Sequence, residues 1–203
     1  MRYAVLEDRP SRDEEAAARR ADPAQGGTMV RRARLTRDRF GQRPAGPGWF
    51  VLNAAQAQWL GHPHFGFKCD FEGARPFAHL GINMRVIAPG QPNCHYHHET
   101  EEEVILVLSG SCRLLVEEQV VPLKAWDFVY LPPGTAHVVV GAGRGPCSLL
   151  MAGRRRRGAG VTYPVSRLAL RYRAGVRKKT NRPRVSYAGL PPRRPARLRW
   201  PPR

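Results

Sequence analysis

Residues 126–137 read WDFVYLPPGTAH, and residues 95–110 read HYHHETEEEVILVLSG. Each stretch holds a short run of β-branched, aliphatic or aromatic residues, with histidine or glutamate at its edge. Turn-forming residues bound the runs, among them Ser109-Gly110 and Pro132-Pro133-Gly134. Short apolar runs between turn signals predict antiparallel strands. We therefore expect two strands that carry histidine and carboxylate side chains near their ends.

Similar runs continue on both sides of these stretches. The chain between them and around them contains apolar segments at Trp49–Leu52, Phe65–Phe71, Leu80–Ala88, Val104–Leu108, Cys112–Val116, Val120–Leu123, Phe128–Leu131, Val138–Val140 and Leu149–Ala152. Many short strands at regular spacing are typical of an all-β fold. The prediction is a small antiparallel β-barrel or sandwich.

The run Val104–Leu108 is apolar at every position instead of alternating. A strand with one wet face would alternate, so both faces of this strand are expected to be covered. The barrel interior would cover one face. An N-terminal segment or a partner subunit would cover the other, and we expect a homodimer on this ground.

Charge divides the chain into three parts. The formal net charge of +18 is made up of +4 over residues 1–44, −3 over residues 45–152 and +17 over residues 153–203. We expect the first part to be a disordered or partly helical extension, with Met29 as a second candidate translation start. The middle part is the predicted barrel, and the last is an Arg/Pro-rich tail that we expect to be mostly extended or disordered.

The basic tail allows two interpretations. Only four of the 34 basic residues are lysines, so most of the arginine excess is expected to reflect composition. The alternative is a phosphate-binding arm in which Arg154, Arg155, Arg156 and Arg157 contact nucleic acid. The tail lacks the dense aromatic interleaving of a single-strand binder, which weakens this alternative.

The cysteines and the hydropathy pattern point to the cytoplasm. Cys69, Cys94, Cys112 and Cys147 form no Cys-x-x-Cys pair, so we expect reduced thiols. Residues 1–20 lack the apolar core of a secretory leader, and no apolar run approaches the roughly 20 residues that a membrane span needs. We expect no membrane partner.

A candidate metal site follows from the histidines. His95 and His97 stand two residues apart, Glu103 begins one predicted strand, and His137 precedes another. Alternate residues of a strand share a face, so both imidazoles of a strand would point to one side. Imidazole nitrogens and a carboxylate oxygen suit Fe, Mn, Ni, Zn or Cu(II). Four such ligands on an octahedral ion would leave positions for a substrate.

The same residues resemble the two motifs of the cupins, a superfamily of small β-barrels. Glu103 and Gly110 match the end of the first motif, and Pro132-Pro133-Gly134 with His137 matches the second. The resemblance covers about residues 80–152 and implies a double-stranded β-helix, or jelly roll, with a divalent metal in the barrel. The subgroup that it suggests is bacterial and supplies no substrate.

The spacing departs from the family pattern. The spacing from Gly90 to His95 is one residue shorter than in the motif, and the spacing from His97 to Glu103 is one or two residues longer. One register points His95 and His97 inward, whereas the other points Tyr96 and His98 inward, because a one-residue slip exchanges the faces. A bulge would reconcile the two. Trp126 replaces the glycine of the second motif, so the turn there is expected to differ.

The resemblance implies two classes of function. The first is a metal-dependent enzyme on a small polar substrate, with Tyr96 or Tyr130 as ligand-binding residues. The second is a non-catalytic barrel that binds or senses a small ligand. Glu101 and Glu102 are expected to form a solvated acidic turn, with either as a second candidate for the carboxylate ligand. The fold does not choose among dioxygenase, isomerase, decarboxylase and epimerase chemistry.

Overall fold

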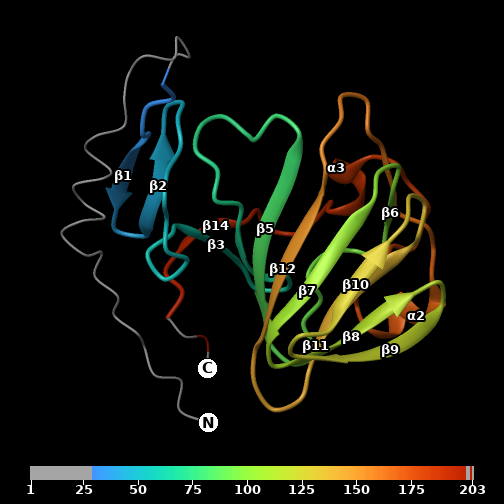
Figure 1. Ribbon diagram of the computed structural model, residues 1–203. Coiled ribbons are helices and arrows are strands. Elements are labelled where there is room, and N and C mark those ends of the chain that lie inside the picture. The colour runs from blue at the N-terminus through green and yellow to red at the C-terminus, as the bar shows by residue number, and fades with distance from the viewer. Residues whose placement is uncertain (1–28, 200–201, 203) are drawn as a thin grey trace. The chain divides into compact units, whose positions relative to one another are not determined.

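A computed structural model describes residues 29–199 and 202, and the elements from Arg34 onward belong to one compact unit, residues 32–203. Its largest sheet has seven strands (Figure 1). In spatial order these are β10 (Phe128–Leu131), β7 (Glu103–Ser109), β12 (Cys147–Arg154), β5 (Leu80–Ile87), β4 (Gly66–Cys69), β3 (Trp59–His62) and β14 (Arg194–Ala196). All its pairings are antiparallel.

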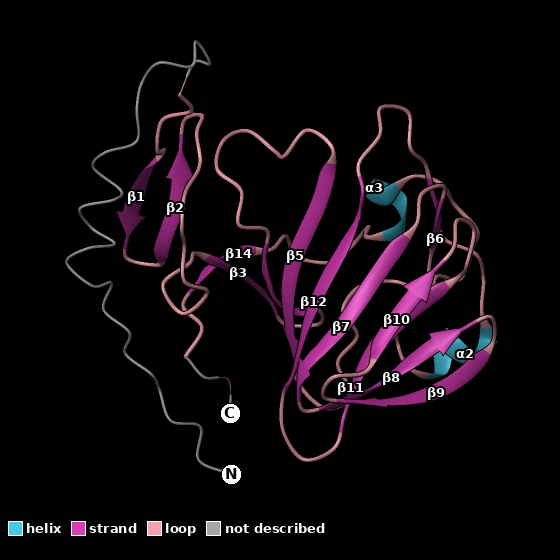
Figure 2. Cartoon of the chain, in the orientation of Figure 1, coloured by secondary structure: helices cyan, strands magenta, loops and turns pink. Residues whose placement is uncertain are grey.

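A second sheet faces the first and completes a jelly roll (Figure 2). It consists of β11 (His137–Ala142), β8 (Ser111–Val116) and β9 (Gln119–Lys124). Two further pairs are β1 (Arg34–Asp38) with β2 (Gly41–Ala45) and β6 (His98–Glu99) with β13 (Val161–Thr162). The expected all-β antiparallel fold is confirmed, and the predicted strands from residue 80 to 154 lie within one or two residues of those observed.

The space between the two sheets is the main core. Every second residue of each strand points into it, as the pleat requires. Ile105 and Val107 enter from β7, Leu149 and Met151 from β12, and Val139 from β11. All five are buried, and the transfer of such side chains from water stabilises the fold by about 1.5–3 kcal/mol each. These inward positions also decide which way the neighbouring polar residues point.

The residues after β12 pack on the barrel. Helix α2 (Arg167–Arg171) begins at Ser166, whose Oγ accepts a hydrogen bond from the amide of Ala169 at 2.9 Å. Its Leu168 packs with Val138 on the outer face of β11. Helix α3 (Pro183–Ser186) follows, and β14 then adds to the large sheet through β3.

Two expectations about the ends of the chain need correction. Residues 153–199 are not mostly extended or disordered, because apolar side chains spaced through the arginines bury themselves against the barrel. Residues 34–45 form the hairpin β1–β2 instead of a disordered or helical extension. The rest of the expected disordered or partly helical extension, residues 1–28, lies outside the described residues. No helix in the described part of the chain is long and apolar enough to cross a membrane.

Both faces of β7 find partners, as its uniform apolarity predicts. Ile105 and Val107 face the core between the sheets, while Leu108 faces a second cluster around Trp59. Leu52 and Ala54 belong to that cluster, so an N-terminal segment of this same chain covers part of the outer face.

Two turns of the barrel have the positive φ angle that glycine adopts most easily. Gly110 has φ of +74°, and a Cβ there would collide with the carbonyl oxygen of Pro146. Trp126 has φ of +75°, which lies in the left-handed region that favours glycine, so a bulky side chain bears the steric cost of this turn.

Candidate metal centre and adjoining cavity

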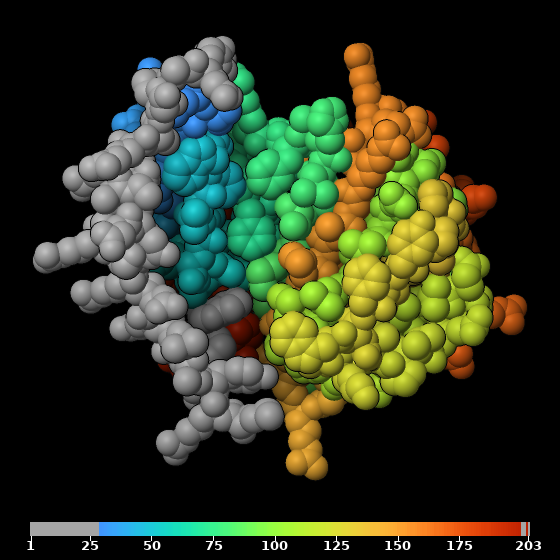
Figure 3. Space-filling model, in the orientation of Figure 1, coloured from blue at the N-terminus to red at the C-terminus, as the bar shows by residue number. Residues whose placement is uncertain are grey.

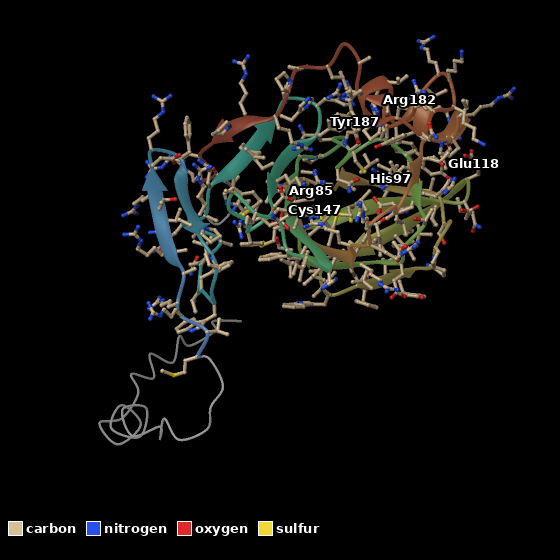
Figure 4. The ribbon with its side chains drawn as sticks, turned by 90° about the horizontal axis from the view of Figure 1, so that it is seen from above. Arg85, His97, Glu118, Cys147, Arg182 and Tyr187 are labelled. Atoms are coloured by element: carbon tan, nitrogen blue, oxygen red, sulfur yellow. The ribbon has the colours of Figure 1, made fainter. Side chains whose placement is uncertain are left out.

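The structure brings His97, Glu103 and His137 together at one end of the barrel. One ligand atom from each lies within 4.8 Å of the others. Oε2 of Glu103 is 3.2 Å from Nε2 of His137 and 3.9 Å from Nε2 of His97. Figure 4 labels His97 among the side chains between the sheets. The geometry therefore offers one carboxylate and two imidazole ligands to a single point.

Strand alternation aims two of these side chains inward. Glu103 is the first residue of β7 and shares its face with Ile105. His137 is the first residue of β11 and shares its face with Val139. His97 reaches the same place because its backbone pairs with that of His137 through two reciprocal hydrogen bonds of 3.1 and 2.8 Å.

Both histidines are held in the orientation that metal binding requires. Nδ1 of His97 lies 2.8 Å from the carbonyl oxygen of His95, and Nδ1 of His137 lies 3.0 Å from that of Thr135. A carbonyl only accepts, so each Nδ1 carries a proton and each Nε2 faces Glu103. Such backbone bonds commonly orient metal-ligating histidines.

The two closest ligand atoms are buried and have unsatisfied hydrogen-bonding capacity. Among the described residues, Oε2 of Glu103 and Nε2 of His137 have no hydrogen-bond partner, and His137 is only 1% exposed. Two buried acceptors that face each other are costly in a folded protein. A divalent cation between them would satisfy both, so the residues present fit a metal ion, and the donor set suits Fe, Mn, Ni or Zn.

Electrostatics keep the carboxylate charged. Burial raises the pKa of Glu103, but the neighbouring imidazoles of His137 and His97 outweigh it, so the pKa lies below its ordinary value. Burial lowers the pKa of His97, yet Cys94, Glu99 and Glu103 raise it well above its ordinary value. A metal ion would compete with the proton on His97.

His95 does not join the cluster, which corrects the predicted set of four ligands to three. Backbone bridges join Pro92 to Val140 and His97 to His137. The segment 92–97 is therefore two residues longer than the segment 137–140 with which it pairs. The extra residues bulge out of register and break the alternation that would have placed His95 beside His97. Nδ1 of His95 instead lies 2.9 Å from Oγ of Ser186.

The alternative register is not observed either. Tyr96 points away from the barrel interior and packs with Leu115 and Leu168, and its hydroxyl accepts a bond from the amide of Glu118 at 3.4 Å. His98 lies in β6, opposite Thr162 of β13. The prediction that Tyr96 binds a ligand in the barrel is therefore corrected, because the bulge turns it to the opposite side.

The remaining acidic and tyrosine candidates pair with neighbouring side chains. Glu101 is 8% exposed, which corrects the expectation that it lies in a solvated turn. The Tyr130 hydroxyl donates to Glu102 at 3.0 Å, and this tyrosine lies on the outer face of β10, so it does not line the barrel. Glu101 accepts from Nε of Arg156 at 2.6 Å. A carboxylate that the prediction passed over, Glu99, lies 3.7 Å from Nε2 of His97.

The four arginines proposed to contact nucleic acid do not act alike. Arg155 binds Glu72 at 2.8 Å and the carbonyl of Phe77 at 2.7 Å, and Arg156 binds Glu101. Ion pairing reduces what either could offer to a phosphate. Arg154 and Arg157 are exposed. Nucleic-acid binding through this segment stays a prediction.

A cavity of about 380 Å³ opens on the inner face of the large sheet, beside the cluster. Its wall combines the core strands with the end of the chain, and it is lined by Leu60, His62, Phe65, Lys68, Arg85, Asn93, Cys94, Tyr187, Leu190, Pro191, Pro192 and Arg193. A second cavity of about 260 Å³ is lined in part by Glu103, Glu99 and Asn83. Figure 4 labels Arg85 and Tyr187.

Sequence reasoning missed Arg85, Tyr187 and Arg193. Arg85 carried a usable signal, since it is a lone charge inside the apolar run Leu80–Ala88 at an inward position. Tyr187 and Arg193 carried no such signal, because the prediction for residues 153–203 rested on their composition alone. Tyr187 stacks on His95 with ring centroids 4.7 Å apart, which only the folded chain brings about.

Comparisons with known proteins agree with this architecture. Residues 83–153 match the family model of the cupin domain. A candidate sugar phosphate isomerase from Acidithiobacillus ferrooxidans is 34% identical over 41% of this chain and 55% of its own, with a TM-score of 0.40. A cupin-superfamily sugar phosphate isomerase from Silicibacter pomeroyi is 22% identical over 43% and 58%, with a TM-score of 0.41.

A polyketide cyclase from Streptomyces resistomycificus is also similar, with 15% identity over 55% of this chain and 83% of its own and a TM-score of 0.46. The chain spans little more than half the length of the two isomerases that it matches. A search of curated proteins found no significant match.

Proposed function

Because the chain contains a cupin domain, we propose that it binds a divalent transition metal through His97, Glu103 and His137 and acts as a metal-dependent enzyme on a small polar molecule. One observation carries the proposal. Two buried ligand atoms, Oε2 of Glu103 and Nε2 of His137, lie 3.2 Å apart and, among the described residues, have no hydrogen-bond partner.

The metal and the surrounding protein groups would have separate roles in such a reaction. A bound metal would supply Lewis-acid or redox chemistry. Glu103 neutralises part of the cationic charge, and the backbone carbonyls of His95 and Thr135 hold the two imidazoles in their binding tautomer. The buried walls from β7 and β11 exclude water, which strengthens every electrostatic interaction with a substrate. Three protein ligands leave room for a substrate at the ion.

Metal binding is tested on untagged protein by elemental analysis and by titration of Fe(II), Mn(II), Ni(II) and Zn(II) into the chelator-treated chain. We expect close to one equivalent of one of these metals and a rise in Tm when it is added back, because only the folded state holds the site. Less than about a tenth of an equivalent, with no binding on titration, would remove the basis of the proposal.

The surroundings of the cluster favour a second candidate function, a barrel that holds a ligand without turning it over. Tyr163 lies beside His97, with ring centroids 5.9 Å apart, and burial raises its pKa to about 12. Burial also raises the pKa of Tyr187 well above its ordinary value. Both phenols stay protonated and serve as hydrogen-bond donors. A metal-loaded protein that binds a ligand unchanged, with no product formed, would support this function.

We also propose that the protein is a homodimer that pairs through the outer face of β10. This strand is an edge of the large sheet and belongs to the yellow part of Figure 3. Phe128 and Tyr130 are 63% and 54% exposed on it, next to Trp126 at 72%. An edge strand with exposed aromatic side chains is a surface that an identical copy can cover about a two-fold axis.

Light scattering after gel filtration tests the dimer. We expect Phe128→Arg to convert a dimeric wild type to a monomer, because two buried arginines would meet at the two-fold axis. Val185→Ser is the matched control, since Val185 is exposed on α3 away from β10. A monomeric wild type, or a dimeric Phe128→Arg variant, would contradict the proposal.

A further inference from the structure

We propose that Arg85 and Arg193 form a subsite for the oxyanion, a carboxylate or a phosphate, of a small ligand in the cavity of about 380 Å³. This inference deepens the proposed function, since it names the substrate class. It can be measured apart from the metal, because the two arginines belong to the cavity and not to the cluster of His97, Glu103 and His137.

Arg85 is a cation held by neutral partners only. Its Nε donates to Oδ1 of Asn83 at 2.8 Å, and one terminal nitrogen donates to the carbonyl of Asn93 at 3.2 Å. Within the described residues no carboxylate lies in ion-pair distance of its guanidinium. Arg85 is half-buried in the cavity wall, and a guanidinium withdrawn from water without a paired carboxylate is costly unless a ligand brings the opposite charge.

Arg193 approaches the same place from the other end of the chain. It donates to the carbonyls of Gly66 and Phe65 at 3.1 and 3.3 Å, and its second terminal nitrogen lies 3.4 Å from the carbonyl of Asn93. That carbonyl oxygen thus accepts from both guanidinium groups. Burial, and after it the charge of Arg85, lowers the pKa of Arg193 to about 10.

The cavity wall is positive as a whole. Its described lining contains the cations Lys68, Arg85 and Arg193 and no aspartate or glutamate. Lys68 is paired with Asp70, which leaves the two arginines as the charges without an acidic partner. Guanidinium forks bind planar carboxylates and phosphates with two parallel hydrogen bonds, so an oxyanion is the chemistry that this wall selects.

The other residues of the cavity wall indicate which chemical groups the rest of the ligand would carry. Leu60, Phe65, Leu190, Pro191 and Pro192 give the cavity an apolar side, and its volume lies in the usual range of small-molecule sites. The partner of Arg85, Asn83, also lines the cavity that contains Glu103. Cys94 of the same wall has its Sγ 3.6 Å from Nδ1 of His97, so the cavity adjoins the candidate metal centre. The apolar residues of the wall suit a ligand with an apolar or neutral body.

Calorimetric titrations with inorganic phosphate and with benzoate test the subsite, and methyl benzoate serves as the neutral analogue. We expect at least one of the two anions to bind the wild type, and methyl benzoate to bind at least about tenfold more weakly than benzoate. Phosphate without benzoate would assign a phosphate ligand, and benzoate without phosphate a carboxylate ligand. Binding of neither anion would overturn the inference.

Variants separate a ligand-binding role from a structural one. Arg85→Met is expected to weaken anion binding at least about tenfold and to raise the Tm of the ligand-free protein by about 3 °C, because it removes an unpaired buried charge. Arg85→Lys keeps the charge and should retain weakened binding. Arg184→Met removes an exposed arginine of α3 and should change nothing. Unchanged anion binding in both Arg85 variants would overturn the inference.

Metal content keeps this result separate from the proposed function. Arg85→Met should hold as much metal as the wild type, since Arg85 offers no ligand to the cluster. A wild type that binds an anion but no metal would leave the subsite standing and refute the metal proposal. A wild type that binds metal but no anion would leave the metal proposal standing and refute the subsite.

Discussion

Glu103→Gln is expected to abolish stoichiometric metal binding while leaving the protein folded. The amide keeps the size of the carboxylate but loses its charge, so the dissociation constant for the metal should rise by more than about 100-fold, beyond the cost of disturbing an outer partner. The amide nitrogen can donate to Nε2 of His137, which lies 3.2 Å from Oε2 of Glu103 and, among the described residues, accepts no hydrogen bond.

One new buried hydrogen bond is worth about 1 kcal/mol, which offsets the lost attraction between Glu103 and His97, so we expect the Tm of the metal-free variant to stay within about 2–4 °C of the wild type. Elemental analysis and a calorimetric melt of the metal-free variant measure the two effects. A lower Tm together with retained metal would show that Glu103 is a structural carboxylate and not a ligand.

Histidine variants provide the matched control for this experiment. His137→Gln removes a ligand of the cluster and should lose the metal as Glu103→Gln does. His95→Gln removes the neighbouring histidine, whose ring instead contacts Ser186 and stacks on Tyr187, and should keep the metal. Loss of metal in His95→Gln with retention in His137→Gln would reverse our choice of ligands.

Truncation after Arg157 is expected to abolish cooperative folding. The removed segment buries Tyr163, Leu168 and Val176, and each such side chain stabilises the fold by about 1.5–3 kcal/mol. Their combined loss is comparable with the whole stability of an ordinary domain. The truncation would also uncover Val138 and Val140 on the outer face of β11. Thermal melts followed by circular dichroism, with solubility after expression, measure the effect.

A control that removes exposed cations of this segment without removing its apolar side chains distinguishes packing from composition. Arg177→Gln, Lys178→Gln and Lys179→Gln together remove three exposed cations and keep the chain length. We expect the Tm of this triple variant to stay within a few degrees of the wild type. A truncated protein that melts as the wild type does would show that the basic segment adds nothing to the fold.

The site could be predicted in part because two of its residues follow local rules. Glu103 and His137 each begin a regular strand, so alternation alone decides that they share faces with Ile105 and Val139. His95 could not be placed in this way. Its segment bulges against β11, and the size of the bulge depends on how two distant stretches pair.

The basic segment shows why composition misled. An average over residues 153–203 is dominated by arginine and proline, whereas burial depends on where single apolar residues fall. Leu168 and Ala169 are buried in a helix of five residues, which is too short to produce a periodic signal. Arg193 likewise reaches the cavity only because β14 adds to β3.

The amino-acid sequence determines the strands, the turns and two ligands of this protein, because these depend on alternation and backbone preference within a few residues. The folded chain decides that His97 and not His95 joins these two ligands, and it adds the cavity with its two arginines. Those features arise where residues 92–97 meet residues 137–140, and where the end of the chain returns to β3 and β4. Such contacts join parts of the chain that are far apart, and their register is decided by packing over the whole domain.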